Sequence, residues 1–237
     1  MIFGTVAVMK NELRLLFATP IAYVFLAGGL FLGGLFFLLG LFETGEASLR
    51  GAMANLGVVL VFLVPVVTMR QFAEEAKSGT LELLLTAPVP PASLVLGKWL
   101  ATTLLGVGLL AATAPWAVAL SIYGDPDPGA LATTWLGMTL CVGGFAAAGL
   151  FASVLTTEPL VAAIGGVLLL LPFWLASVAV EHAPATLRPW LYRASFVDHL
   201  RSFARGVLDT GDVAWFGLVT TVFLFLTWRT LEARRWR

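Results

Sequence analysis

The sequence predicts an all-α membrane protein with six transmembrane helices in a single domain, residues 1–237. Hydrophobic residues make up 59% of the chain and charged residues only 12%, about half the charged fraction of a soluble domain. Apolar runs close to 20 residues long recur along the chain, and this is the length that a helix needs to cross a bilayer. Polar or turn-rich segments separate these runs, as the connections between spans require.

The segment before the first apolar run, residues 1–20, predicts a helix in the membrane interface. Its apolar and charged residues alternate at helical spacing, so one apolar face can lie toward lipid. A frayed, solvated N-terminus is the alternative, but it would leave Leu16 and Phe17 exposed to water.

Glycine and proline give two of the predicted spans distinct features. Gly29 and Gly33 form a GxxxG pair in the first span, which favours close helix packing, although glycine is common in spans in any case. Pro65 is expected to kink the second span because its ring removes a backbone hydrogen bond. The six spans are predicted at residues 21–42, 52–69, 99–122, 131–155, 160–180 and 213–228.

A polar segment between spans five and six, residues 181–212, predicts an amphipathic helix. Apolar residues recur there at helical spacing, and arginines fall largely between them. We expect this helix on the membrane surface or dipping into the membrane, with Gly206 or Gly211 at its end.

The distribution of Lys and Arg predicts that both termini are cytoplasmic. An even number of spans places the two ends on one side, and this orientation puts nine of the fourteen basic residues inside and five outside. The bias agrees with the positive-inside rule. Residues 69–98 would then be cytoplasmic, and residues 181–212 would lie outside.

The sequence offers no candidate catalytic, cofactor or metal site, so the chain is not expected to be an enzyme. The two histidines, His182 and His199, lack the spacing of a metal site and are interpreted as surface residues. The single cysteine, Cys141, excludes a disulfide within the chain. A formal net charge of zero gives no indication of a nucleic-acid partner.

A nucleotide-binding loop was tested at Gly97 and Lys98, the pair that a Walker A motif requires. Ala92 stands where the first glycine of the motif belongs, and Trp99 stands where Ser or Thr belongs. The motif fails, and any ATP would have to be bound by another chain.

The segment of residues 69–98 carries most of the functional information. Its charged side chains cannot lie in hydrocarbon without a heavy cost. We expect a helix through Lys77, a turn with positive φ at Gly79, and a short helix that Thr80 caps, with Glu82 in its first turn. Pro88 should end that short helix.

The predicted helix pair is about thirty residues long and apolar on one face, which favours docking on another protein. A hydrated loop whose leucines lie against lipid is the alternative.

Three stretches of this segment resemble a known family. Arg70 to Glu75 (RQFAEE), Gly79 to Pro88 (GTLELLLTAP) and Leu96 to Lys98 (LGK) look like the coupling region of type-two ABC exporter permeases. The stretches at 11–23, 147–163, 196–209 and 231–236 resemble other parts of the same family. Within it, the chain is most similar to the branch of the gliding-motility-associated and nitrous-oxide-reductase maturation permeases.

The resemblance implies a permease domain in the bacterial cytoplasmic (inner) membrane, with an elbow helix at 1–20 and a coupling helix hairpin at 69–98. It implies a separate ABC ATP-binding subunit whose ATP hydrolysis drives an unknown substrate across the membrane, so this chain itself binds no cofactor. A second permease copy or a sister permease would complete a dimer.

The resemblance also assigns residues to the contact with the ATP-binding subunit. Glu74, Glu75 and Glu82 are expected to make this contact, or to brace the segment against basic groups of the elbow helix. The full set is Arg70, Phe72, Glu74, Glu75, Gly79, Thr80, Glu82, Leu84 and Pro88.

Two other functions remain open. The chain could be a membrane anchor or assembly component of a multi-protein complex, such as a motility or cofactor-maturation apparatus, without classical transport. A membrane-embedded enzyme is disfavoured because no polar catalytic set converges within the predicted spans. Copurification of an ATP-binding subunit separates the transporter from the anchor.

Overall fold

The computed structural model describes residues 2–44, 50–86, 89–123 and 127–235, and every regular element in these ranges is a helix. Six helices in this part of the chain are long and apolar enough to cross a membrane. The predicted all-α fold with six membrane-spanning helices is therefore confirmed. The spans are formed by α2 (Pro20–Thr44), α3 (Arg50–Met69), α6 (Pro91–Ala111) with α7 (Ala114–Tyr123), α8 (Pro128–Leu155), α9 (Pro159–His182) and α12 (Thr210–Arg235).

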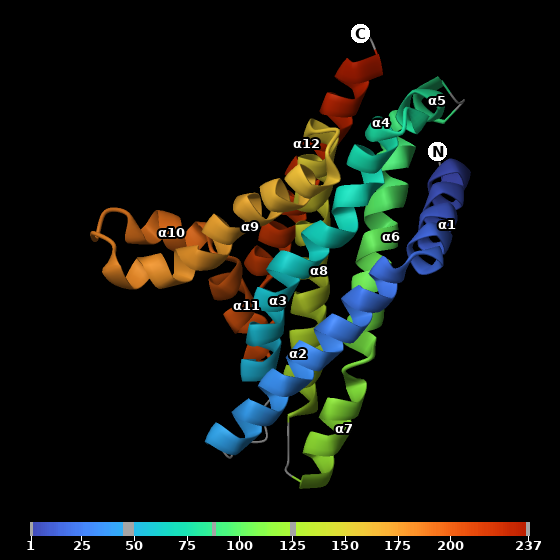
Figure 1. Cartoon of the computed structure of the whole chain (residues 1–237). Helices are drawn as coiled ribbons and strands as arrows, with labels where there is room; N and C mark the ends of the chain where they lie inside the picture. The colour runs from blue at the N-terminus through green and yellow to red at the C-terminus, as the bar shows by residue number, and fades with distance from the viewer. Residues whose placement is uncertain (1, 45–49, 87–88, 124–126, 236–237) are drawn as a thin grey trace.

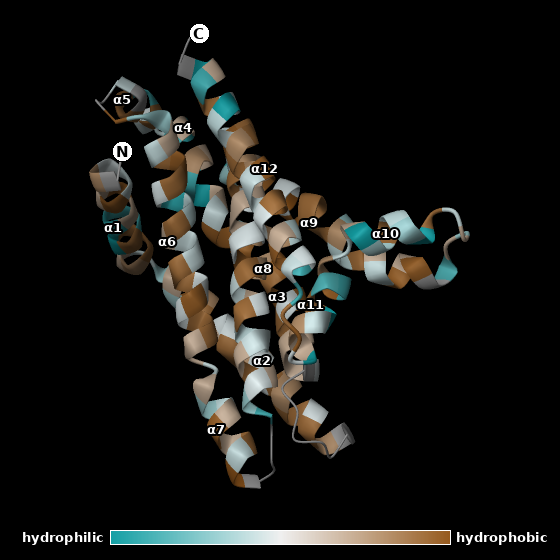
Figure 2. Cartoon of the chain, turned by 180° about the vertical axis from the view of Figure 1, so that it is seen from behind, coloured by the Kyte–Doolittle hydropathy of each residue, from teal (hydrophilic) through white to brown (hydrophobic). Residues whose placement is uncertain are grey.

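Helix α8 lies at the centre of the bundle and packs against α3, α6, α9 and α12. Within its most apolar window, 78% of the residues are buried, the largest share of any span. Small residues from Gly143 to Gly149 allow neighbouring helices to come close to it. The colouring in Figure 2 shows the spans around α8 to be predominantly hydrophobic.

Helix α1 (Ile2–Ala18) is present where a helix was predicted before the first span. It packs along the first half of α6, and Figure 1 shows the two side by side at the end of the bundle that also holds α5 (Thr80–Thr86) and the C-terminus. The close approach occurs at Gly97, where an added Cβ would lie 2.6 Å from Cγ1 of Val8 and 3.0 Å from the backbone oxygen of Thr5. The place of α1 in a membrane interface stays a prediction.

The helix of the second span runs beyond the predicted span of residues 52–69, and the expected helix through Lys77 is present. Instead of ending at Met69, α3 continues through the π-helix η1 (Arg70–Glu74) into α4 (Glu75–Lys77). Its first polar turns stay helical because α6 and α8 supply partners for them, as described below. Pro65 lies inside α3, and the expected kink there stays a prediction.

The third span also differs from its prediction. Its helix, α6, begins at Pro91 and so includes residues before Trp99, where the apolar span was predicted to begin. The span is interrupted at Ala112 and Thr113, between α6 and α7. Pro115 explains the break, because proline lacks the N–H that would bond the carbonyl of Ala111 in a continuous helix.

The polar segment at 181–212 forms two helices, α10 (Arg188–Ala194) and α11 (Phe196–Ala204), instead of one. Ser195 separates them, and its hydroxyl caps α11 by accepting the Asp198 N–H at 3.1 Å. Gly206, with φ of 84°, follows the end of α11 as predicted. Figure 1 shows α10 projecting sideways while α11 returns to the bundle, where it packs against α8 and α9.

The predicted GxxxG pair packs closely against other helices. A Cβ at Gly29 would lie 2.6 Å from a methyl group of Leu109, and one at Gly33 would lie 2.8 Å from the ring of Trp116. The close-packing interpretation of this pair is therefore confirmed.

Candidate functional site

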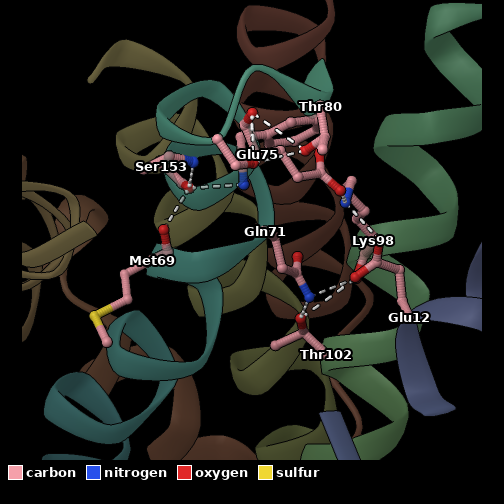
Figure 3. A network of polar contacts seen from close by, with 11 residues as sticks. Glu12, Met69, Gln71, Glu75, Thr80, Lys98, Thr102 and Ser153 are labelled. Carbon is pink, nitrogen blue, oxygen red and sulfur yellow. Dashed lines mark hydrogen bonds and ion pairs between the residues drawn. The ribbon is translucent and has the colours of Figure 1, made fainter. Parts of the chain in front are cut away.

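The polar segment after α3 begins with a π-helix whose backbone is held by a side chain from α8. Ser153 Oγ accepts the N–H groups of Phe72 at 3.1 Å and Ala73 at 3.0 Å, and donates to the backbone oxygen of Met69 at 3.1 Å. A π-helix shifts the backbone bonding by one residue and often marks a functional site. The backbone groups that Ser153 bonds lie where this shift occurs, and Figure 3 shows Ser153 beside η1.

Gln71, the second residue of η1, points toward α6 (Figure 3). Its Nε2 donates to Thr102 Oγ1 at 2.6 Å and to the backbone oxygen of Lys98 at 3.4 Å. Its Oε1 is buried and has no hydrogen-bond partner among the described residues. The amide therefore ties η1 to α6 while leaving one buried acceptor unused.

Lys98 is the centre of the cluster. Its side chain is 1% exposed, and its Nζ donates to Glu12 Oε1 at 2.5 Å and to Glu75 Oε1 at 2.6 Å. One buried ammonium thus links α1, α4 and α6 (Figure 3). A buried charge is tolerated only when it is paired, so these three helices are held in one arrangement. Glu75 Oε2 is buried without a partner among the described residues.

Helix α5 is attached to η1 and to the spans through an apolar contact. Leu81, 6% exposed, belongs to a buried cluster with Phe72 of η1. The other buried members are Val95 of α6, Leu150 and Val154 of α8, and Leu231 of α12. The turn between α4 and α5 contains Gly79 with φ of 75°, which confirms its predicted conformation. The second helix begins at Thr80, one residue earlier than expected, and the Thr80 hydroxyl donates to the backbone oxygen of Glu75 at 3.3 Å.

The structure separates the predicted contact residues into a buried root and an exposed tip. Phe72 is 1% exposed, and Glu75 faces Lys98. Gly79, Thr80 and Glu82 are exposed at the tip. Pro88 lies outside the described residues.

Two further predicted residues, Arg70 and Glu74, pair with each other, with Arg70 Nη2 2.8 Å from Glu74 Oε1. Together with the half-buried Leu84 they line a cavity of about 380 Å³ between α1 and the α4–α5 turn. Asn11 and Leu15 of α1 form its other wall.

The predicted brace is present in a different form. The expectation was that a carboxylate of this segment would meet basic groups of the elbow helix. The base that meets Glu75 is instead Lys98 of α6, and α1 contributes the acid Glu12. This difference arises because Gly97 lets α1 lie against α6, which brings Glu12 to the buried ammonium.

Sequence reasoning missed Lys98, Glu12, Ser153 and Thr102 as parts of the site. A usable signal existed for Lys98, since it stands alone at the edge of an apolar run and therefore needs an acidic partner. The sequence did not say which of the acidic residues would reach it. Ser153 gave no signal at all, because serine is common in spans and its partners lie 80 to 84 residues away.

The described residues contain no group of three or more His, Cys, Asp or Glu side chains that could hold a metal ion. Gly97 and Lys98, tested as a nucleotide loop, lie inside helix α6, and both carboxylate partners of Lys98 come from this chain. The cluster is thus a mechanical connection between helices, with an exposed tip that is free to contact another molecule.

A comparison with protein families identifies the class of protein. The chain matches the model of a family described as ABC-2 family transporter protein over residues 36–193, from the end of the first span to α10. No curated protein matches the chain. The family match confirms the resemblance to type-two ABC permeases, and the matched residues include the whole of η1, α4 and α5. The chain therefore belongs to the ABC-2 family of transporter membrane proteins.

Proposed function

We propose that this chain is the permease subunit of an ABC exporter in the bacterial cytoplasmic membrane, with both termini in the cytoplasm. Membership of the ABC-2 family implies a multi-pass membrane subunit with an ABC ATP-binding partner. In this proposal ATP hydrolysis occurs in that partner, and the permease moves in response. A second copy or a sister permease completes the transporter, in the branch of the gliding-motility and nitrous-oxide-reductase maturation permeases.

The observation that carries the proposal is the combination of an exposed tip with a buried root. Leu83 is 72% exposed at the tip, next to exposed Glu82, where a large apolar side chain has a use if another protein covers it. A few residues away, Leu81, Phe72 and Glu75 are fixed among the spans.

The root distributes a force on the tip to several spans. Glu75 is bonded to Lys98 of α6, and the Phe72 N–H is bonded to Ser153 of α8, while η1 continues α3 without a break. Packed side chains and rigid helices of this kind transmit displacement well because they have little free volume. We infer that docking on the tip and motion of the spans are coupled through these contacts.

Copurification with the ATP-binding subunit tests the tip. The double variant Glu82→Arg, Leu83→Asp should reduce the ATP-binding subunit recovered with the tagged permease at least tenfold, because it reverses one charge and removes an apolar anchor. Leu208→Asp is the matched control, since Leu208 is 57% exposed just before α12 begins, whereas the tip lies near the C-terminal end of α12. It should leave copurification unchanged.

Equal recovery from the tip variant and the wild-type chain would contradict the assignment of the tip. If the wild-type chain itself recovers no ATP-binding subunit, the assembly or anchor function replaces the transporter. Glu75 is unsuitable for this test, because Glu75→Arg would place a second cation against buried Lys98 and disturb the root.

A further inference from the structure

A cavity of about 420 Å³ lies between α3, α8, α9 and α11, at the end of the bundle opposite to α5. Its volume falls in the range of about 300–1,000 Å³ that small-molecule sites occupy. Met53 of α3 and Met138 of α8 are 1% and 2% exposed, and Trp174 of α9 is 9% exposed, so these residues form the floor. The floor is apolar and built from three different spans.

The mouth of the cavity is cationic. Arg201 of α11 and Arg205, the residue that follows the end of α11, line it, and both are exposed. Arg201 lies four residues after Val197 and therefore on the same face of α11, and Leu200 lines the cavity as well. Figure 2 shows hydrophilic stretches on α10 and α11 against predominantly hydrophobic spans.

The two arginines leave one positive charge uncompensated. Arg201 Nη1 lies 3.0 Å from Asp198 Oδ1, so that pair is neutral together. Arg205 forms no ion pair with any carboxylate of the described residues. The nearby Asp212 is engaged by His199, at 2.6 Å, and by Ser202. One monovalent anion at the mouth would balance the charge of Arg205.

We propose that this cavity binds a single-chain anionic amphiphile from the membrane, with its acyl chain on the methionine and tryptophan floor and its carboxylate or phosphate at Arg201 and Arg205. Methionine adapts its shape to flexible apolar ligands. Arginine suits the head group because its guanidinium binds carboxylate and phosphate with paired hydrogen bonds. The volume, near the lower end of the range for ligand sites, favours one acyl chain over a two-chain lipid.

The site is separate from the coupling root and does not depend on the proposed ATP-binding partner. It would supply the membrane subunit with a binding place for a lipid-like molecule between its own helices. Its position among α3, α8 and α9 means that a bound chain would contact three spans directly.

Photolabelling of the full-length chain tests the proposal. The protein is reconstituted in vesicles of neutral phosphatidylcholine and exposed to a diazirine-bearing palmitic acid or to its uncharged methyl ester. We expect the acid to label peptides that contain Met53, Met138 or Trp174 at least tenfold more than the ester does, because only the acid has the anionic head group.

Two matched pairs of variants locate the head group and the acyl chain of the bound amphiphile. Arg205→Gln, which leaves no carboxylate unpaired, should lower labelling by the acid at least threefold, and Arg201→Gln with Arg205→Gln at least tenfold. Arg188→Gln with Arg193→Gln removes the same charge from α10, outside the cavity, and should change nothing. Ala54→Trp fills the cavity from an exposed position and should abolish labelling, whereas Ala132→Trp, exposed on α8 outside the cavity, should not.

Four results would overturn the proposal. Equal labelling by acid and ester would remove the role of the arginines, and equal losses in the two arginine pairs would reduce it to general attraction. Labelling of the floor peptides that survives Ala54→Trp would exclude the amphiphile from this cavity. Failure of the acid to label these peptides in the wild-type chain, as when a second copy covers the cavity, would exclude it as well.

Discussion

At the scale of single residues, Lys98 should have the largest effect on stability. Lys98→Met removes the ammonium and leaves Glu12 and Glu75 facing each other in a buried place. Breaking a buried ion pair by removing one partner destabilises proteins by about 3–5 kcal/mol. We expect a loss of this size in the free energy of unfolding, measured by denaturant or thermal unfolding of the purified chain in mild detergent.

The control for this prediction is Lys77→Met. Lys77 also pairs with a glutamate, Glu158 at 2.7 Å, but both side chains are more than half exposed. Exposed pairs contribute at most about 1 kcal/mol, so this variant should stay close to the wild-type chain. Similar losses in the two lysine variants would mean that burial of Lys98 does not matter, contrary to the role given to it here.

Ser153 should be needed for the π-helix rather than for general packing. Ser153→Ala leaves the N–H groups of Phe72 and Ala73 without their acceptor, and each such loss costs about 1–3 kcal/mol. Hydrogen exchange of these two amides should accelerate at least tenfold. Ser177→Ala is the comparison, because the Ser177 hydroxyl bonds only a carbonyl of its own helix; its neighbours should keep their protection. Unchanged exchange at Phe72 and Ala73 would show that η1 does not depend on Ser153.

Single residues differ in how far the sequence reveals them. Gly79 could be predicted because positive φ is a local requirement that glycine meets. The burial of Phe72 and the pairing of Glu75 could not, since they depend on α6 and α8, which are distant in sequence. The sequence therefore could not divide the residues expected to contact a partner into a buried root and an exposed tip. That division depends on how the helices pack against one another.

At the scale of helices, the close approach of α1 to α6 depends on Gly97. Gly97→Ala places a Cβ against Val8 and the backbone oxygen of Thr5, and overpacking of this kind costs about 1–3 kcal/mol. We expect lower thermal stability and faster proteolysis between α1 and α2.

Gly108→Ala provides the matched change on the same helix. Gly108 is exposed, and an added Cβ there would meet nothing within 4 Å. Alanine favours helix over glycine by about 1 kcal/mol, so this variant should be neutral or slightly stabilised. A stable Gly97→Ala chain with undisturbed α1 would show that the two helices are not closely packed.

Helix positions were predictable where hydrophobic length alone decides them. The six spans follow from runs near the thickness of a bilayer, and these runs end at polar residues or prolines. The two breaks were missed for local reasons. Pro115 lies inside an apolar run that is long enough for one unbroken span, and the Ser195 cap lies in a segment whose apolar periodicity continues from α10 into α11.

At the scale of the whole molecule, two helices connect the tip region to the cavity. Helix α3 carries Met53 in the cavity floor and runs on into η1, while α8 carries Met138 in the floor and Ser153 at η1. Both α3 and α8 therefore join η1 to the floor of the cavity. Such a connection joins two sites through rigid elements rather than through a chain of loose contacts.

The orientation of the chain is the property of the whole molecule that the proposals require. The tip must face the compartment that contains ATP, which places Ser78 in the cytoplasm and Leu208 outside. In a Cys141→Ala background, Ser78→Cys should react with a membrane-impermeant maleimide only after the cells are permeabilised. Leu208→Cys should react in intact cells, and the wild-type chain should not react in either case because Cys141 is fully buried.

The reverse pattern would turn the tip away from ATP and end the proposal that an ATP-binding subunit docks there. Reaction of both cysteines in intact cells would instead show that the segment between them crosses the membrane an even number of times, against the three spans α6 with α7, α8 and α9.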